Sequence, residues 1–457
     1  MTLQSQLAHY GGSKIRTDPF PARRHIGPEE KIAVAAFMDQ VIESGVLPAY
    51  DGPEEQAYCK EFAAWLGGGY ADGVSSGSAA VFVALKALDL EPFHEVIVGA
   101  FTDPGGMMPI ALQNLIPMIA DSAPDSYCTG PAQIEAVITP LTRAIVVPHI
   151  AGDPADMVAI MALARRHNLP VIEDCAQAHG ATIEGNMVGT WGDLAAFSTM
   201  GGKHHSTGPQ GGVVYTHDEA RYQAVRRASD RGKPFFLPPG TTNVTASLNF
   251  NLNDLAAAIG RVQLRKLPAS IARRQVIVAQ LREGLADVAA ITLAPSRPGR
   301  TSSHWFLPVH FHPDYVTCDK TAFCAALRAE GLPVMTDYRG GMPHCQDWFV
   351  NRRVFGHSGY PWASADYKGD PTRTFPCPNA HAMIESHFNL MIHEHWGNRE
   401  IDDTVAIVQK WSVRFDLCER FETVDLVCCK CLLLPENPIF HPVDNLSPLV
   451  YTTAIGQ

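Results

Sequence analysis

The sequence predicts an α/β fold in which a mostly parallel sheet is sandwiched by helices, followed by a smaller α+β domain. From about residue 74 onward, short runs that are almost wholly apolar alternate with segments of helical period. Because these runs lack the alternating polar positions of a half-exposed strand, both faces of the sheet must be covered. After residue 250 the pattern changes to long helices and a shorter strand-and-helix group. The chain of 457 residues is long enough for two or three such domains.

The large domain begins with a turn and a helix over residues 74–90, where small residues precede apolar residues at helical spacing. An amphipathic pattern predicts a second helix at 155–168, between two strands. Strand, helix and strand in this order favour a parallel sheet. The apolar runs predict strands at 95–101, 117–121, 144–150, 169–174, 193–199 and 211–217.

The second part of the chain is predicted to start with two helices, at 253–267 and 270–288, that are broken at Pro268. A strand at 304–312 and a helix at 321–333 follow, and residues 338–380 have the composition of long irregular loops. We therefore expect four parts, namely an N-terminal arm (1–30), a large domain (31–265), a small domain (266–415) and a tail of unknown role (416–457).

The composition excludes several classes of partner. Lys and Arg total 36 against 47 Asp and Glu, a net charge of −11 without a basic block, so neither nucleic acid nor an anionic membrane surface is expected. No segment resembles a signal peptide or a membrane span, which favours a cytoplasmic protein. The 11 cysteines are irregularly spaced, as reduced thiols are. Cys428 and Cys431 form only half of a zinc site, so an apolar tail is preferred to a metal there.

Polar residues gather where the predicted strands end, which is where α/β sheets bind ligands. Small residues at 75–80 open a helix, and such a helix start either holds a phosphate or is an ordinary cap. Asp174 ends the strand at 169–174 and is suited to bind a metal, cap a loop or pair with a protonated ring nitrogen. His149 and His179 lie nearby as metal ligands or, more commonly, as packed core residues.

Lys203 follows Ser198, which ends the strand at 193–199, by five residues. Composition alone favours a solvated loop lysine, whereas a lysine that forms a Schiff base must lose its proton through burial or a neighbouring charge. A phosphate cradle, an aspartate, a serine and a lysine in this chain order are what a pyridoxal phosphate (PLP) site requires. The constellation therefore favours the chemical interpretation of Lys203, and no metal site is expected.

The motifs in this order resemble the DegT/DnrJ/EryC1/StrS family of sugar aminotransferases, which have PLP fold type I. The resemblance covers about residues 25–415, and its most specific parts are "IEDCAQAHGA" and the serine followed by lysine in "AFSTMGGK". It implies that Lys203 is the Schiff-base lysine and general acid/base, that Asp174 pairs with the pyridine nitrogen, and that Gln177 lies against the ring or its hydroxyl. The residues implied to hold the phosphate are Gly77, Ser78 and Ser198.

The resemblance also implies a homodimer with shared active sites, because Asn249 would reach the phosphate of the neighbouring subunit. Asp103 departs from the family, since it stands where members carry the aromatic residue that stacks on the cofactor ring. The loop after the lysine reads "TGPQGG", and Asn251 replaces a common arginine. These departures leave the other residues that are expected to bind the cofactor in place, and they alter the expected surroundings of the substrate.

The family transfers an amino group, usually from glutamate or glutamine, to a keto sugar that is nucleotide-linked or to a cyclitol-like ketone. Candidate substrate contacts are His204 beside the lysine, His344 in a loop and His393 in "LMIHEHWGN". His393 is equally well explained as a packed residue. Two alternatives stay open, namely a PLP-dependent sugar dehydratase or aromatising enzyme on the same fold, and a non-catalytic binding or regulatory protein that has kept the fold.

Overall fold

The computed structural model describes residue 8 and residues 11–419, without side chains from 412 onward. The described residues up to Phe415 form one compact unit, to which the following description refers. The predicted tail, with Cys428 and Cys431, lies outside the described residues, except that helix α12 (Asn398–Glu419) runs a few residues into it. No described helix is both long and apolar enough to span a membrane.

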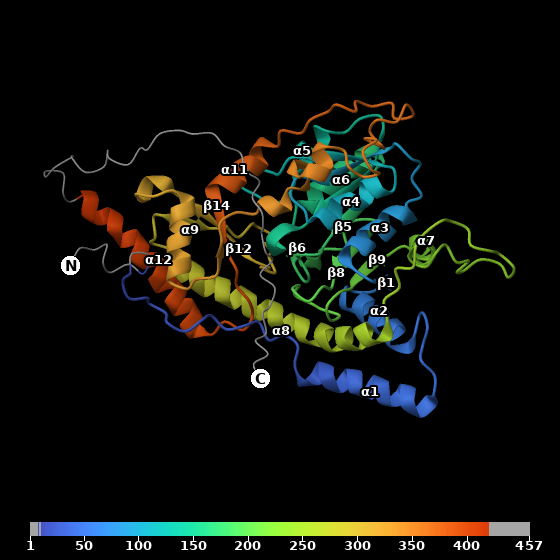
Figure 1. Cartoon of the computed structure of the whole chain (residues 1–457), viewed down its shortest axis with the longest axis horizontal. Coiled ribbons are helices and arrows are strands. Elements are labelled where there is room, and N and C mark those ends of the chain that lie inside the picture. Colours follow the sequence, from blue (N-terminus) through green and yellow to red (C-terminus); the bar gives the residue numbers. More distant parts are fainter. Residues whose placement is uncertain (1–7, 9–10, 420–457) are drawn as a thin grey trace. The chain divides into compact units, whose positions relative to one another are not determined.

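A seven-stranded sheet forms the centre of the unit and lies among helices (Figure 1). Its strand order is β1-β9-β8-β5-β4-β2-β3, and only β9 runs antiparallel to its neighbours. Every residue of β2, β3, β5, β8 and β9 is buried, because helices cover both faces. The strands are β1 (Tyr70–Val74), β2 (Glu95–Gly99), β3 (Ile116–Ala120), β4 (Thr142–Pro148), β5 (Val171–Asp174), β8 (Leu194–Ser198) and β9 (Gly212–Thr216).

The predicted mostly parallel sheet is thus confirmed, with one additional edge strand, β1. The helices around it begin at capped residues: Ser76 caps α3, Asp103 caps α4 and Asp156 caps α6 by accepting a backbone N–H. These helices are α1 (Pro28–Ser44), α2 (Pro53–Trp65), α3 (Gly77–Ala87), α4 (Pro104–Leu112), α5 (Pro131–Glu135), α6 (Met157–His167) and α7 (Glu219–Ser229).

A second, antiparallel sheet has the order β10-β12-β14-β13 and encloses its own apolar core with α9, α12 and the end of α8. A small third sheet joins β11 to β6 and β7. The remaining elements are β6 (Thr182–Ile183), β7 (Asn186–Met187), β10 (Ile291–Leu293), β11 (Arg300–Thr301), β12 (Leu307–Phe311), β13 (Val334–Met335), β14 (His387–Leu390), α9 (Lys320–Ala329), α10 (Asp347–Val350) and α11 (Pro378–Ser386).

The predicted break at Pro268 is wrong, because α8 (Asp254–Gly284) is one helix of 31 residues that passes through it. A proline inside a helix costs about 3 kcal/mol. Here the two halves of α8 are buried in different cores, with Leu264 and Leu267 in the first and Ile277 and Leu281 in the second. Burial of both halves offsets the local cost. The helix therefore crosses the predicted domain boundary at 265/266.

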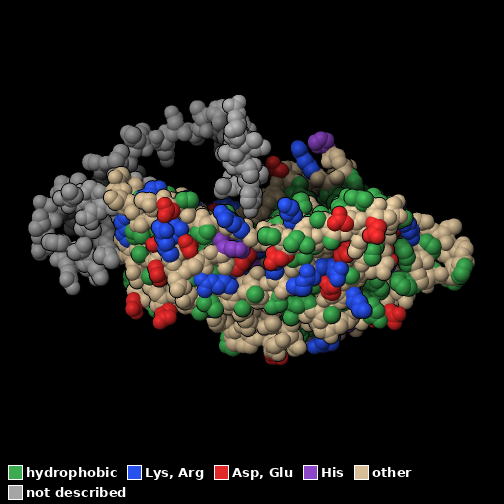
Figure 2. Space-filling model, turned by 90° about the horizontal axis from the view of Figure 1, so that it is seen from below, with side chains coloured by type: hydrophobic (Ala, Val, Ile, Leu, Met, Phe, Trp, Pro, Cys, Tyr) green, Lys and Arg blue, Asp and Glu red, His purple; other side chains and the backbone are tan. Residues whose placement is uncertain are grey.

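The segment 338–380 is largely irregular, as predicted, but it packs on the core of the large sheet. Phe349, Trp362 and Tyr367 are buried in that core, and the Tyr367 hydroxyl donates to Glu95 at the start of β2 (2.8 Å). The surface carries both signs of charge, and Figure 2 shows Lys and Arg side chains interspersed with Asp and Glu over one face.

Candidate active site

The carboxyl ends of the neighbouring parallel strands β5 and β8 bring Asp174 and Ser198 to one edge of the sheet. The loop that leaves β8 folds back and carries Lys203 to the same edge. Lys203 N–H donates to the Met200 carbonyl (2.9 Å), so the lysine sits in a tight turn. The sequence-predicted aspartate, serine and lysine thus belong to one site.

Lys203 is buried, with 6% of its surface exposed, so it is not a solvated loop lysine. Its amine lies 4.0 Å from the centre of the Trp305 ring and forms no hydrogen bond with a described residue. Burial lowers the pKa of Lys203, while the charges of Asp103 and Asp174 act in the opposite direction. A buried amine with a lowered pKa is closer to the neutral form that a nucleophile needs.

Asp174 is buried as well, and burial raises its pKa. Its Oδ1 accepts the Ala176 N–H (3.1 Å), whereas Oδ2 has only the Thr102 hydroxyl at 3.5 Å. A buried carboxylate oxygen with so weak a partner has capacity for a further donor. The protonated ring nitrogen of a pyridine is such a donor.

The first turn of α3 supplies an anion site next to Ser198. Ser76 accepts hydrogen bonds from the backbone N–H groups of residues 79 and 80. The N–H groups of Gly77 and Ser78 are left without a partner within the helix. A Cβ on Gly77 would lie 2.6 Å from the Ser198 Cβ, so only glycine allows α3 and β8 to approach this closely. Two free N–H groups, two hydroxyls and the positive helix end fit a phosphate.

Gln177 is held in place by two hydrogen bonds. Its Oε1 accepts the Ala151 N–H (3.0 Å), and its Nε2 donates to the Tyr338 hydroxyl (2.7 Å). Tyr338 packs parallel to Phe101, with ring centres 6.2 Å apart. Tyr338 and Trp305 are therefore aromatic residues of the site that the sequence did not identify. Both come from segments far along the chain, where no local motif marks them.

Asp103 acts as the N-cap of α4, because its Oδ1 accepts the Gly105 N–H (2.9 Å), and the residue is exposed. Its charge raises the pKa of both Lys203 and Asp174. That Asp103 stands where family members carry the stacking aromatic residue stays a prediction.

Of the three candidate substrate histidines, His204 and His393 have hydrogen-bond partners, whereas neither ring nitrogen of His344 has one among the described residues. His204 is buried, and its Nε2 lies 3.0 Å from the Ser303 carbonyl. His393 donates to the Pro21 carbonyl (2.9 Å) and accepts the His395 N–H, so both ring nitrogens are used. His344 is buried near the end of β2, and burial lowers its pKa to about 4. A substrate contact by His393 would require an existing hydrogen bond to break, whereas His204 Nδ1 has no partner among the described residues.

His205 and His179 are core residues, as the packing interpretation predicts for His179. His205 stacks on Tyr58 and shares a hydrogen bond with its hydroxyl (2.7 Å), and burial lowers its pKa to about 3. Burial places the pKa of His179 well below its usual range. Neutral histidines do not lower the pKa of Lys203, so burial of the amine is the cause of that shift.

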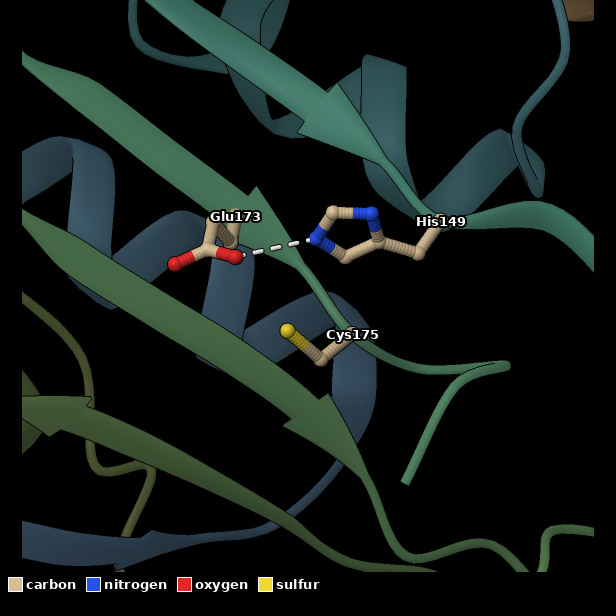
Figure 3. Close-up of side chains that lie close together, drawn as sticks. All are labelled: His149, Glu173 and Cys175. Atoms are coloured by element: carbon tan, nitrogen blue, oxygen red, sulfur yellow. Dashed lines mark hydrogen bonds and ion pairs between the residues drawn. The ribbon is translucent and has the colours of Figure 1, made fainter. Parts of the chain in front are cut away.

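A buried trio of His149, Glu173 and Cys175 has the composition of a metal site (Figure 3). His149 Nδ1 accepts the Ala155 N–H (3.1 Å), so its proton is on Nε2, which donates to Glu173 (3.0 Å). Glu173 also accepts three backbone N–H groups, from residues 189, 191 and 192. The histidine has no free lone pair for a metal, and the trio instead anchors the strand end that carries Asp174.

Asn249 is exposed, and its side-chain oxygen accepts hydrogen bonds from the backbone and side chain of Asn251. The same segment runs beside the start of α3, since Ser75 N–H donates to the Phe250 carbonyl (2.7 Å). The reach of Asn249 into a neighbouring subunit stays a prediction.

Comparison with known proteins identifies the family. Residues 28–409 match the DegT/DnrJ/EryC1/StrS aminotransferase family over most of the chain. The chain belongs to this family. The predicted fold type and amino-group transfer are thereby confirmed, and the family implies PLP as cofactor.

Two curated relatives and one solved structure show what the chain is similar to. It is 33% identical over 347 residues to the L-glutamine:2-deoxy-scyllo-inosose aminotransferase of Streptoalloteichus tenebrarius (73% of this chain, 81% of the relative). It is 34% identical over 398 residues to the dTDP-3-amino-3,4,6-trideoxy-alpha-D-glucose transaminase of Streptomyces venezuelae (87% and 97%). An aminotransferase structure from Psychrobacter cryohalolentis matches with a TM-score of 0.77 at 27% identity (87% and 100%).

Proposed function

We propose that this family member is a cytoplasmic, PLP-dependent aminotransferase that transfers an amino group from glutamine or glutamate to a keto sugar or a cyclitol ketone. The observation that carries the proposal is the buried Lys203 amine, which has no hydrogen-bond partner among the described residues and whose pKa is influenced by the charge of Asp174. The names of the relatives support the substrate classes, because one relative acts on an inosose and the other on a nucleotide-linked sugar.

The residues of the site fit the cofactor. The free N–H groups of Gly77 and Ser78 and the Ser198 hydroxyl would hold its phosphate, and Asp174 would keep its ring nitrogen protonated. When bound, PLP supplies an electron sink for the carbon that loses a proton. Gln177, fixed by Ala151 and Tyr338, would orient the ring.

In the proposed function, Lys203 is the residue that holds the cofactor covalently and transfers protons. In the resting enzyme its amine would hold the cofactor as a Schiff base, and an incoming donor amine would displace it. Once free, the Lys203 amine would act as the base that removes a proton from the donor carbon and as the acid that gives a proton back. Burial lowers the pKa of the Lys203 amine, which favours its neutral form.

The proposal is tested by absorption spectra of the protein loaded with PLP, before and after L-glutamine or L-glutamate is added without a ketone. Conversion of the cofactor to pyridoxamine phosphate is expected, whereas Lys203→Ala should bind PLP without a reducible link. A loaded enzyme that ignores both donors would favour the dehydratase alternative. A protein that forms no link to PLP would favour the binding-protein alternative.

We also propose that the enzyme is a homodimer with shared sites. Apolar side chains are exposed on α1 and on the loop that follows it, and Ile42 is 74% exposed and Leu47 68%. Leu248, which is 64% exposed, directly precedes Asn249. Apolar patches of this kind mark interfaces.

Mixing two inactive variants tests the shared site. A mixture of Lys203→Ala and Asn249→Ala should regain activity, because one of the two sites in each mixed dimer is intact. Light scattering should give twice the chain mass. A monomer, or a mixture that stays inactive, would contradict the proposal.

A further inference from the structure

One arginine of the N-terminal arm holds the backbone on both sides of Lys203. Arg23 Nη1 donates to the Gly202 carbonyl (2.9 Å), and Nη2 donates to the His204 carbonyl (3.4 Å). Its Nε donates to Glu394 in the segment after β14 (2.8 Å). The Arg23 side chain is 11% exposed; its bonds to Glu394 and to the His204 carbonyl are part-buried, and its bond to the Gly202 carbonyl is exposed. The peptide groups next to Lys203 are therefore fixed by a residue about 180 positions away.

A second arginine holds the aromatic ring that the Lys203 amine contacts. Arg274 Nη1 donates to the carbonyls of His304 (2.8 Å) and Trp305 (3.2 Å). Trp305 Nε1 in turn donates to the Gly202 carbonyl (3.2 Å), which Arg23 also binds. The Trp305 ring is thus tied to the lysine loop at one edge and to α8 through its backbone.

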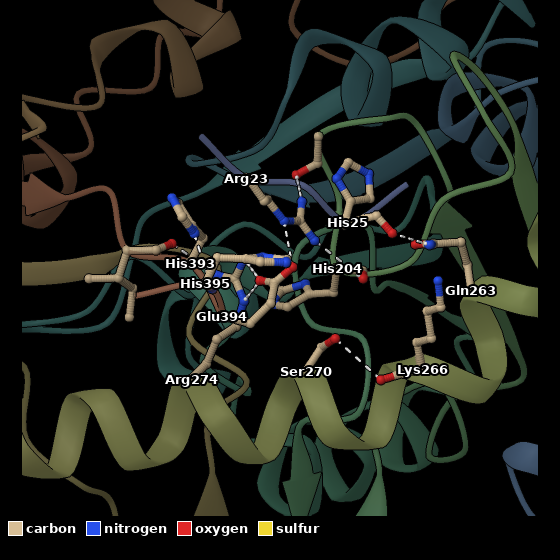
Figure 4. Close-up of polar contacts among 12 residues, drawn as sticks. Arg23, His25, His204, Gln263, Lys266, Ser270, Arg274, His393, Glu394 and His395 are labelled. Atoms are coloured by element: carbon tan, nitrogen blue, oxygen red, sulfur yellow. Dashed lines mark hydrogen bonds and ion pairs between the residues drawn. The ribbon is translucent and has the colours of Figure 1, made fainter. Parts of the chain in front are cut away.

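Glu394 joins the two arginines. Its Oε1 accepts from Arg23, and its Oε2 accepts from Arg274 Nε (2.9 Å) and Nη2 (2.7 Å). Figure 4 shows the carboxylate between the two guanidinium groups, above helix α8. The side chains of Glu394 and Arg274 are 7% and 2% exposed. Without this carboxylate, two buried cations would face each other.

We propose that Glu394 is a positioning residue, which through Arg23 and Arg274 fixes the Lys203 backbone and the Trp305 ring in the geometry that lets the lysine amine transfer protons. The inference rests on the proposed role of Lys203. Its physical basis is that a freed lysine must reach the reacting carbon by side-chain rotation alone. A displacement of about 1 Å at such a group costs roughly 100-fold in rate.

Other titratable groups nearby do not replace Glu394. His393 is neutral at physiological pH, since burial lowers its pKa to about 4, and burial also lowers the pKa of His25. Burial places the pKa of His204 well below its usual range. Among the described residues, Glu394 is also the only carboxylate that is ion-paired to Arg23 or Arg274.

The experiment compares Glu394→Gln and Arg23→Met with Arg399→Met as matched control. Arg399 pairs with Asp18 of the same arm (3.0 Å), but both side chains are more than 60% exposed and neither contacts the lysine loop. The first readout is acylation of Lys203 by acetic anhydride in the cofactor-free protein, followed by mass spectrometry over a range of pH. The second is the rate constant of the L-glutamine half-reaction and the glutamine concentration at half-maximal rate.

We expect Glu394→Gln and Arg23→Met to raise Lys203 acylation several-fold, because the amine is released from Trp305. The rate constant should fall roughly 10- to 100-fold, with the half-maximal glutamine concentration little changed. Arg23→Lys should recover part of the rate, and Arg399→Met should match the wild type.

Unchanged acylation and an unchanged rate constant in both Glu394→Gln and Arg23→Met would overturn the proposal. An equal loss in Arg399→Met would do so as well, because general loosening of the arm would then explain the effect. If the wild type fails to react with L-glutamine while acylation still responds to Glu394→Gln, the positioning role stands and the proposed function fails.

Discussion

Replacing Glu173 with glutamine should destabilise the protein, although the two side chains have the same shape. Glu173 is fully buried and accepts from four donors, two on each oxygen: His149 Nε2 and Gly189 N–H on Oε2, and the N–H groups of Trp191 and Gly192 on Oε1. Among the described residues, no lysine or arginine is ion-paired to Glu173, and these four N–H groups are its hydrogen-bond donors.

The magnitude follows from the donors that Glu173→Gln leaves without an acceptor. Whichever way the new amide turns, its NH₂ group faces two N–H donors. His149 cannot adapt, because its Nδ1 is used by the Ala155 N–H. Each buried donor left without a partner costs about 1–3 kcal/mol, so the loss of two acceptors should lower the free energy of unfolding by about 2–6 kcal/mol.

Urea unfolding at neutral pH measures the effect, with Glu135→Gln as control. Glu135 is half-exposed and pairs with the exposed Arg166 at 3.4 Å, so its substitution should change the free energy of unfolding by less than about 0.5 kcal/mol. If Glu173→Gln were as mild as the control, the proton assignment of His149 would be wrong, and the trio would again be open to a metal.

Three further predictions concern other parts of the unit. Asp103→Asn keeps the helix cap but removes a charge that raises the pKa of Lys203, so acylation of Lys203 in the cofactor-free protein should shift to lower pH; an unchanged profile would place Asp103 away from the amine. Pro268→Ala should raise the free energy of unfolding in urea by up to about 3 kcal/mol, because the helix interior regains a backbone N–H and loses the clash of the proline ring; a loss would mean that α8 needs the proline. Burial lowers the pKa of His205 to about 3, so its stabilising contribution is complete above pH 6.5 and is lost as the pH falls toward 3; urea midpoints that stay constant from pH 7 to 5 would contradict this.

Much of the fold could be predicted because the strands of a sheet covered on both faces are short apolar runs, which are visible without any partner. Strand β1 was missed because Asp72 stands at its centre. The Asp72 carboxylate can be buried because Arg226 of α7 forms an ion pair with it. A local sequence pattern cannot indicate a partner that lies about 150 residues away in the chain. The break at Pro268 was predicted wrongly because a proline is a strong local sign of a helix end. The burial of α8 in two cores, which offsets the cost of the proline, cannot be seen in the local sequence.

The candidate site likewise contains two kinds of residue, those that a local sequence pattern indicates and those that act through contacts between distant segments. Gly77, Ser198 and Asp174 stand at strand and helix ends and Lys203 in the loop after β8, so local patterns in the sequence are enough to predict them as candidate site residues. Residues such as Trp305 and Arg23 act through contacts between distant segments, and each has many possible uses when seen alone.

Asp103 shows why departures from a family motif need the structure. Two requirements meet at this position, namely an N-cap for α4 and a ring to support the cofactor, and one side chain cannot meet both. Aspartate meets the first by accepting the Gly105 N–H. The ring would then depend on Gln177 and on the Tyr338 that holds it, both of which are fixed by hydrogen bonds before any ligand arrives. Asp103 therefore contributes a helix cap, and under the proposed function support for the cofactor ring would come from Gln177 and Tyr338, which only the folded chain brings together.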